Sequence, residues 1–160
     1  MTRLPLSIAL AIVAVLPALG EDVPFAAPPP PNLGQSSTYL ASLGDIMGKI
    51  QLRHIKLWYA IKSKNWELLD YELGQIRDSF ENAVIFYRNI PVDFIVSADK
   101  PLIALQEAVK SKDGAKLERG FADLTTACNN CHKAAQVGFI FIQTPTYSPF
   151  SDQIFKPTQK

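Results

Sequence analysis

Apolar side chains recur three and four positions apart along four successive stretches of this chain. The stretches cover about residues 37–62, 66–89, 97–112 and 114–137. This spacing places the apolar side chains on one face of an α-helix, so each stretch predicts an amphipathic helix. The repeating positions of the first stretch are Leu40, Leu43, Met47, Ile50, His54, Leu57 and Ile61. Those of the fourth are Leu117, Phe121, Leu124, Cys128, Cys131 and Ala135.

Polar residues and prolines mark the ends of these predicted helices. Pro91 ends the second helix, and the third begins at Ser97 or Asp99 with Pro101 in its first turn. The predicted N-caps are Ser36, Ser37 or Thr38 for the first helix, Asn65 for the second and Asp113 for the fourth. Four amphipathic helices with short connections predict an all-α fold, an up-down-up-down four-helix bundle.

The two ends of the chain differ from this central bundle. Residues 1–20 combine one basic residue, an apolar run and a small-residue ending, which predicts a cleaved secretory signal peptide. The apolar run is shorter than the roughly 20 residues of a spanning helix. Residues 21–35 form a proline-rich lead-in, the bundle occupies 36–137, and 138–160 form an irregular, apolar C-terminal tail. We therefore expect a periplasmic protein with no stable membrane insertion after cleavage, whose tail packs on the bundle or on a partner.

Charge adds little to this picture. The chain has 16 basic and 15 acidic residues, and removal of Arg3 with the signal peptide leaves 15 of each. A nearly neutral protein without a basic run gives no reason to expect a nucleic-acid partner. No pairing of a nucleophile with a base, and no paired carboxylates, points to an enzyme.

The chemistry concentrates in one short motif, Cys128-Asn-Asn-Cys131-His132, which holds both cysteines. This is the c-type haem attachment pattern. Each thiol adds to one haem vinyl group, and the histidine that follows can bind the iron as its proximal ligand. A structural disulfide would close too small a loop to stabilise much, and a zinc site needs about four ligands. A thiol redox pair remains an alternative, although such pairs usually sit at a helix N-terminus.

An exported four-helix bundle with CxxCH near the end of its last helix resembles the cytochrome c-prime family. The resemblance covers about residues 35–137 and rests on "CNNCH" and the helix pattern; the apolar tail and "QLRHIKLWYA" depart from it. It implies one covalent haem c inside the bundle, with a residue of the first helix facing the iron opposite His132. Members of the family carry electrons or bind small gases such as nitric oxide, and many dimerise. A homodimer is therefore a further expectation.

Two residues of the first predicted helix are candidates for the sixth iron ligand. Met47 and His54 are seven residues apart, so both face inward, about 10 Å apart along the helix. Counting along antiparallel helices places Met47 closer than His54 to the level of His132, and the family position also favours Met47. The alternatives are that Met47 packs in the core and that His54 is a core histidine with a polar partner.

These observations predict an exported monohaem c-type cytochrome that transfers single electrons to a redox partner that the sequence does not identify. Cys128 and Cys131 tether the haem, His132 binds the iron, and Met47 binds opposite it. One alternative is a five-coordinate haem protein that binds a small gas. The other is a haem-free exported bundle with a binding or thiol-redox role.

Overall fold

The structure, a computed structural model, describes residues 40–88, 90 and 92–158. The predicted signal peptide, the proline-rich lead-in and the predicted N-caps Ser36, Ser37 and Thr38 lie outside these residues. Among the described helices, none combines the length and the apolar character that crossing a bilayer requires.

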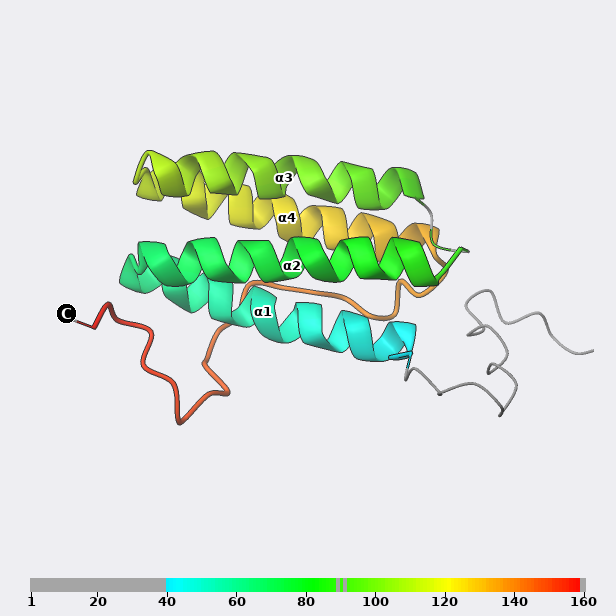
Figure 1. Cartoon of the computed structure of the whole chain (residues 1–160), viewed down its shortest axis with the longest axis horizontal. Helices are drawn as coiled ribbons and strands as arrows, with labels where there is room; N and C mark the ends of the chain where they lie inside the picture. Colours follow the sequence, from blue (N-terminus) through cyan, green and yellow to red (C-terminus); the bar gives the residue numbers. More distant parts are fainter. Residues whose placement is uncertain (1–39, 89, 91, 159–160) are drawn as a thin grey trace, which may run out of the picture.

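Four helices, each antiparallel to the one before it, form the bundle, as Figure 1 shows. They are α1 (Leu43–Ser63), α2 (Trp66–Phe86), α3 (Val92–Lys110) and α4 (Gly114–Ala134). Consecutive helices pack on each other, and α4 also contacts α1, which closes the bundle. The predicted all-α, up-down-up-down four-helix bundle is therefore confirmed.

Helix α1 begins later than the sequence pattern predicts. Ser42 and Asp45 form a reciprocal capping box, in which each side chain accepts a hydrogen bond from the backbone N–H of the other at 3.1 Å. This arrangement satisfies two N–H groups that have no partner within the helix. The helix begins at Leu43 for this reason, and Leu40 lies exposed before it.

The turns after α1 and α3 have the same structure: a residue in the left-handed conformation is followed directly by the N-cap of the next helix. The residue in each turn that adopts the left-handed conformation is a lysine, Lys64 with φ 54° and Lys112 with φ 52°. The next residue, Asn65 or Asp113, caps the following helix by accepting a backbone N–H three positions on. Both predicted N-caps are confirmed, and these turns are what folds the chain back on itself.

Helix α3 begins at Val92, well before the predicted start at Ser97 or Asp99, so Pro101 lies in its interior. An interior proline removes one helical hydrogen bond, at a cost of about 3 kcal/mol. Burial of Ile95 and Ala98, which extend the apolar face toward Val92, offsets that cost. The proline was therefore a misleading marker of the helix start.

Two helices end earlier than predicted. Helix α2 ends at Phe86 rather than Asn89, and buried Tyr87 leaves the helix and donates its hydroxyl to the Ala41 carbonyl at 2.6 Å. Helix α4 ends at Ala134 rather than Val137, because the Val137 N–H turns back to the His132 carbonyl at 2.9 Å. This bond, with Gln136 in the left-handed conformation, is a Schellman ending.

The core fills the space between the four helices. Helices α3 and α4 approach closely at buried Gly120, where an added Cβ would lie 2.9 Å from Leu105 Cγ. Glu72 is a buried carboxylate, and it pairs with Arg53 at 2.9 Å. The largest fully buried apolar side chains are Phe121, Leu57, Leu69, Leu73, Ile76, Leu102, Leu105, Leu117 and Leu124.

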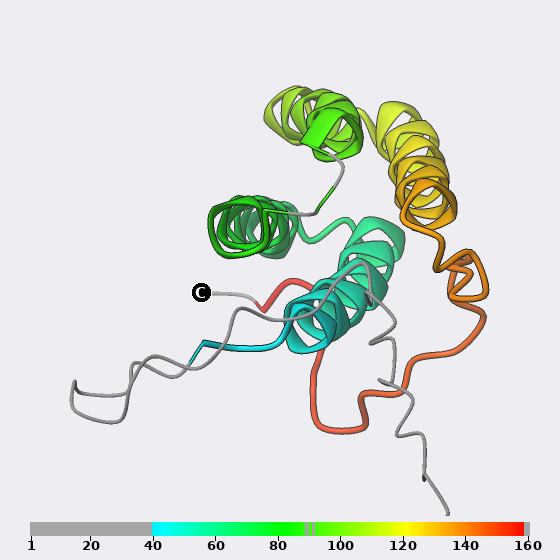
Figure 2. The same cartoon turned by 90° about the vertical axis from the view of Figure 1, so that its right-hand side faces the viewer.

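The C-terminal tail, described over residues 136–158, contacts the bundle near both of its ends. Figures 1 and 2 show it leaving the end of α4 and running back beside α1 toward the opposite end of the bundle. There the Phe155 carbonyl accepts from Ser63 Oγ at 2.8 Å and from Asn65 Nδ2 at 3.0 Å. The tail is thus an irregular fifth segment that follows α1.

Candidate functional site

Cys128 and Cys131 lie one turn apart near the end of α4. They continue the face that carries Leu117, Phe121 and Leu124, and both are half-buried against the core. Neither is in a disulfide. The helix therefore presents two free thiols in succession along its inner face.

The surroundings of these thiols keep them protonated. Burial raises the pKa of Cys128 to about 12, and the neighbouring Cys131 contributes in the same direction. Burial also raises the pKa of Cys131. Reactive redox cysteines show the opposite shift, because a positive helix N-terminus or a basic neighbour stabilises their thiolate. The two thiols thus lack the electrostatic setting of a redox pair.

His132 lies in the last turn of α4 with its ring turned toward the tail. Its Nδ1 is 2.7 Å from the backbone carbonyl of Ile140. A carbonyl oxygen only accepts, so Nδ1 carries the proton and donates it. A neutral ring in this tautomer keeps the lone pair on Nε2, which is the atom a metal ion can bind.

Asn129, between the two cysteines, holds the tail beside this histidine. Its Nδ2 donates to the Ile142 carbonyl and its Oδ1 accepts from the Ile142 N–H, both at 2.8 Å. Sequence reasoning missed this contact and the Ile140 carbonyl. The asparagine occupies a variable position of the motif, and a backbone carbonyl has no signature in the sequence, so only the path of the tail reveals them.

His54 occupies a different environment, inside the bundle. It is 3% exposed, and its ring packs against that of Phe121, with centroids 4.3 Å apart and the planes tilted by 30°. Its Nε2 is 2.8 Å from Thr125 Oγ1, whose own proton goes to the Phe121 carbonyl at 2.9 Å. Nε2 of His54 is therefore the donor. Burial lowers the pKa of His54 to about 4, so the ring is neutral at pH 7, as the core-histidine interpretation predicts.

Contacts between α1 and α4 define the register of these antiparallel helices. A step toward the end of α1 corresponds to a step toward the start of α4, so partners shift in opposite directions. Three contacts agree on this register: His54 with Thr125, the Trp58 and Phe121 rings at 4.9 Å, and Lys62 Nζ with Glu118 Oε1 at 3.5 Å.

This register relates Met47 to His132. Met47 precedes His54 by seven residues, and His132 follows Thr125 by seven, so Met47 and His132 share one level of the bundle. His54 lies about 10 Å away along the axis. Met47 is partly buried and packs against the core. Figure 2 shows α1 and α4 diverging toward the end that carries these two residues.

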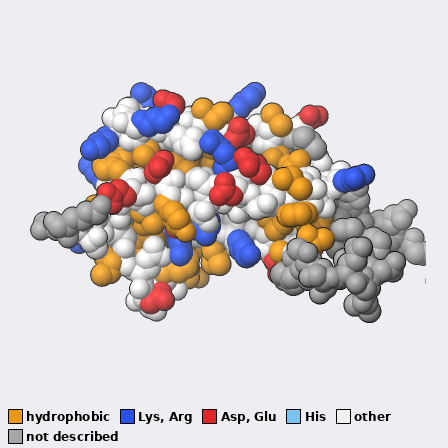
Figure 3. Space-filling view, viewed as in Figure 1, with side chains coloured by type: hydrophobic (Ala, Val, Ile, Leu, Met, Phe, Trp, Pro, Cys, Tyr) orange, Lys and Arg blue, Asp and Glu red, His pale blue; other side chains and the backbone are white. Residues whose placement is uncertain are grey.

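Basic residues near His54 have partners elsewhere. Arg53 pairs with buried Glu72 and also lies over the Tyr71 ring, 5.5 Å from its centroid. Lys56 Nζ lies 4.8 Å from the centroid of the Phe150 ring in the tail. On the face shown in Figure 3, basic and acidic side chains are intermingled rather than gathered by sign.

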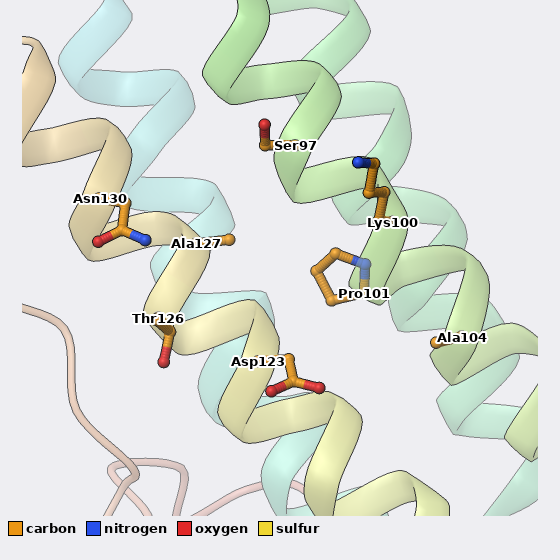
Figure 4. Close-up of a pocket in the computed structure, with 8 residues that line it drawn as sticks. All are labelled: Ser97, Lys100, Pro101, Ala104, Asp123, Thr126, Ala127 and Asn130. Atoms are coloured by element: carbon orange, nitrogen blue, oxygen red, sulfur yellow. The ribbon is translucent and has the colours of Figure 1, made fainter.

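A pocket of about 500 Å³ lies in the groove between α3 and α4, and Figure 4 shows its lining. Lys100 and Pro101 line it from α3, and Asp123, Ala127 and Asn130 from α4. Neither motif cysteine lines this pocket, nor does His132. Within the described ranges, no three His, Cys, Asp or Glu side chains gather as a ready metal-ligand group.

Comparison of the chain with protein-family models, with curated proteins and with solved structures finds no match. The resemblance to the cytochrome c-prime family therefore rests on the attachment motif and on the confirmed bundle architecture, and remains an expectation.

Proposed function

We propose that this protein is a monohaem c-type cytochrome that transfers single electrons. Cys128 and Cys131 tether the haem, and Nε2 of His132 binds its iron. One observation carries the proposal: directly after two free, inward-facing thiols comes a histidine whose Nδ1 already donates to the Ile140 carbonyl. A metal-binding histidine ordinarily has its other ring nitrogen engaged in this way.

The donors of this site fit a covalent haem chemically. Each protonated thiol adds across a vinyl double bond, so a carbon–sulfur bond forms and the thiol hydrogen goes to the other vinyl carbon. The addition consumes no oxidant or reductant, and burial keeps Cys128 in the thiol form. When bound, the haem supplies an iron that changes its oxidation state by one electron.

Met47 is the sixth ligand in this proposal. Its support is the register between α1 and α4, which puts Met47 at the level of His132. A methionine thioether opposite a histidine is an electron-transfer ligand set that raises the reduction potential. His54 is the weaker candidate, because its Nε2 is engaged by Thr125 two helical turns away.

A five-coordinate, gas-binding haem protein is the second candidate. The observation that favours it is the packing of Met47 against the hydrophobic core, which is the ordinary role of a partly buried methionine. Iron with an apolar side chain opposite His132 would be open to carbon monoxide or nitric oxide.

The proposed location follows from the predicted signal peptide at residues 1–20. Haem attachment to CxxCH takes place on the exported side of a membrane, so a periplasmic protein is proposed. Its redox partner is a second protein that accepts or supplies one electron.

Expression of the full chain together with haem-attachment machinery tests the proposal. We expect a mass increase of one haem, a Soret band, and a low-spin spectrum that carbon monoxide leaves unchanged. Met47→Ala should turn the spectrum high-spin and sensitive to carbon monoxide, whereas His54→Ala should leave the iron low-spin.

Other outcomes identify the alternatives. A wild-type spectrum that is already high-spin and gas-sensitive supports the gas-binding protein. If the chain gains no mass and shows no Soret band, while Cys128→Ser and Cys131→Ser behave like wild type, a haem-free bundle replaces both haem proposals.

A further inference from the structure

The tail beside His132 is held by a closed set of hydrogen bonds. The Val137 N–H donates to the His132 carbonyl, and the Ile140 N–H donates to the Val137 carbonyl, both at 2.9 Å. The Ile140 carbonyl accepts from His132 Nδ1 at 2.7 Å. Residues 132–140 thus form a loop that returns to the histidine ring where it began.

Asn129 holds this loop in place. Its side-chain amide uses both its donor and its acceptor on the backbone of a single residue, Ile142. Two parallel bonds fix direction as well as distance, as a pair of bonds between neighbouring strands does. Because only one residue separates Ile142 from Ile140, this clamp also restricts where the Ile140 carbonyl can lie.

The neighbouring asparagine provides a contrast. Asn130 is exposed and lines the pocket between α3 and α4 instead of facing the tail (Figure 4). The two asparagines of "CNNCH" are therefore chemically identical and point in different directions. Only Asn129 can act on His132 through the tail.

We propose that Asn129 and tail residues 137–142 are the positioning element of His132. Asn129 clamps Ile142, the clamp presents the Ile140 carbonyl, and this carbonyl fixes the tautomer and the ring orientation that leave Nε2 free. The role as an iron-ligand support rests on the proposed function, whereas control of the tautomer does not. The tail, which the family resemblance does not account for, thereby becomes part of the site.

The hydrogen bond from His132 to the Ile140 carbonyl should lower the reduction potential of a bound iron. A histidine that donates Nδ1–H to a carbonyl is a stronger electron donor through Nε2, which favours the oxidised metal. Loss of the clamp frees the ring, weakens that donation and raises the reduction potential. The same change at Asn130 should do neither.

The first test uses the full chain before haem attachment, labelled with ¹⁵N in its histidines. In wild type, His132 should give the Nδ1–H tautomer and His54 the Nε2–H tautomer, which serves as an internal reference. Asn129→Ala should remove the Nδ1–H signature of His132 and leave His54 unchanged. Asn130→Ala is the matched control and should leave both unchanged.

A second variant, Asn129→Asp, removes one of the two hydrogen bonds of the clamp instead of both. It retains the acceptor for the Ile142 N–H but replaces the donor by a charged carboxylate oxygen. Only one of the two bonds of the clamp then remains, so the population of the tautomer should be intermediate. If the His132 tautomer in Asn129→Ala equals that of wild type, while His54 shows that the fold is intact, the positioning role is overturned.

The second test uses the haem-loaded protein and reads its reduction potential. Asn129→Ala should raise the potential relative to wild type, and Asn130→Ala, the control, should leave it unchanged. An altered tautomer with an unchanged potential would overturn the effect on the iron. Absence of any haem would instead refute the proposed function and leave the tautomer experiment to decide the clamp.

Discussion

At the scale of the residue, the two histidines of this chain lie in opposite environments. His54 is buried and donates through Nε2 to Thr125, whereas His132 lies at the edge of the bundle and donates through Nδ1 to Ile140. The acceptor decides which nitrogen keeps its lone pair. The sequence identified both residues as candidates, but the acceptors are visible only after folding.

Burial of His54 predicts that stability depends on pH between 4 and 6.5. The pKa of His54 falls from 6.5 in the unfolded chain to about 4 in the fold, so within this window the unfolded state binds the extra proton. The free energy of unfolding should therefore drop by about 3 kcal/mol as the pH falls from 6.5 to 4. Well above pH 6.5, where neither state binds this proton, the residue contributes no further change.

Urea unfolding at a series of pH values measures this effect. His54→Gln keeps a donor for Thr125 and cannot be protonated, so the difference between wild type and the variant isolates His54. Parallel pH profiles for the two proteins would show that His54 does not cause the acid sensitivity.

At the scale of the element, the spacing of apolar residues predicts four helices because each has to bury one face. The pattern placed the caps Asn65 and Asp113 correctly, since an N-cap is a local interaction between a side chain and the backbone three residues on. It misplaced the start of α3, where packing of Ile95 and Ala98 outweighs the local effect of Pro101.

Replacing glycine by alanine should have opposite effects at Gly120, where α3 packs closely on α4, and at Gly74 of α2, which has open space beside it. Gly120→Ala should lower the free energy of unfolding by about 1 kcal/mol or more, since overpacking against buried Leu105 costs about 1–3 kcal/mol. Gly74→Ala meets nothing within 4 Å and should raise it by about 0.5–1 kcal/mol through helix propensity. Denaturant midpoints measure both, and stabilisation by Gly120→Ala would show that the helices can move apart freely.

At the scale of the whole molecule, the tail ties the two ends of the bundle together. Asn129 and His132 hold it at the end of α4, and Ser63 and Asn65 hold its Phe155 carbonyl at the far end of α1. Between these anchors the tail exposes large apolar side chains, including Tyr147 and Ile154. Its polar backbone contacts, rather than its apolar composition alone, therefore determine its path.

The far anchor predicts a local effect of substitutions in the tail. The Phe155 ring contacts those of Tyr59 and Phe150, with centroids at 5.5 and 6.1 Å. Phe155→Ala should lower stability by roughly 1 kcal/mol and speed proteolysis within residues 144–158, because it removes this aromatic contact. Ile154→Ala, at a side chain 75% exposed, is the matched control and should leave both unchanged. Equal cleavage rates for the two variants would show that the Phe155 ring does not help to hold the tail on the bundle.

The sequence alone was enough to predict four helices, the caps at Asn65 and Asp113, and the inward face that carries Cys128 and Cys131, because these depend on spacing and on contacts within a few residues. It also identified the CxxCH motif and the candidate ligands Met47, His54 and His132. The register that puts Met47 level with His132, the partner of each histidine and the path of the tail became known only from the folded chain. Those features depend on contacts between segments distant in sequence, including bonds to backbone carbonyls, which every residue possesses and no residue type reveals.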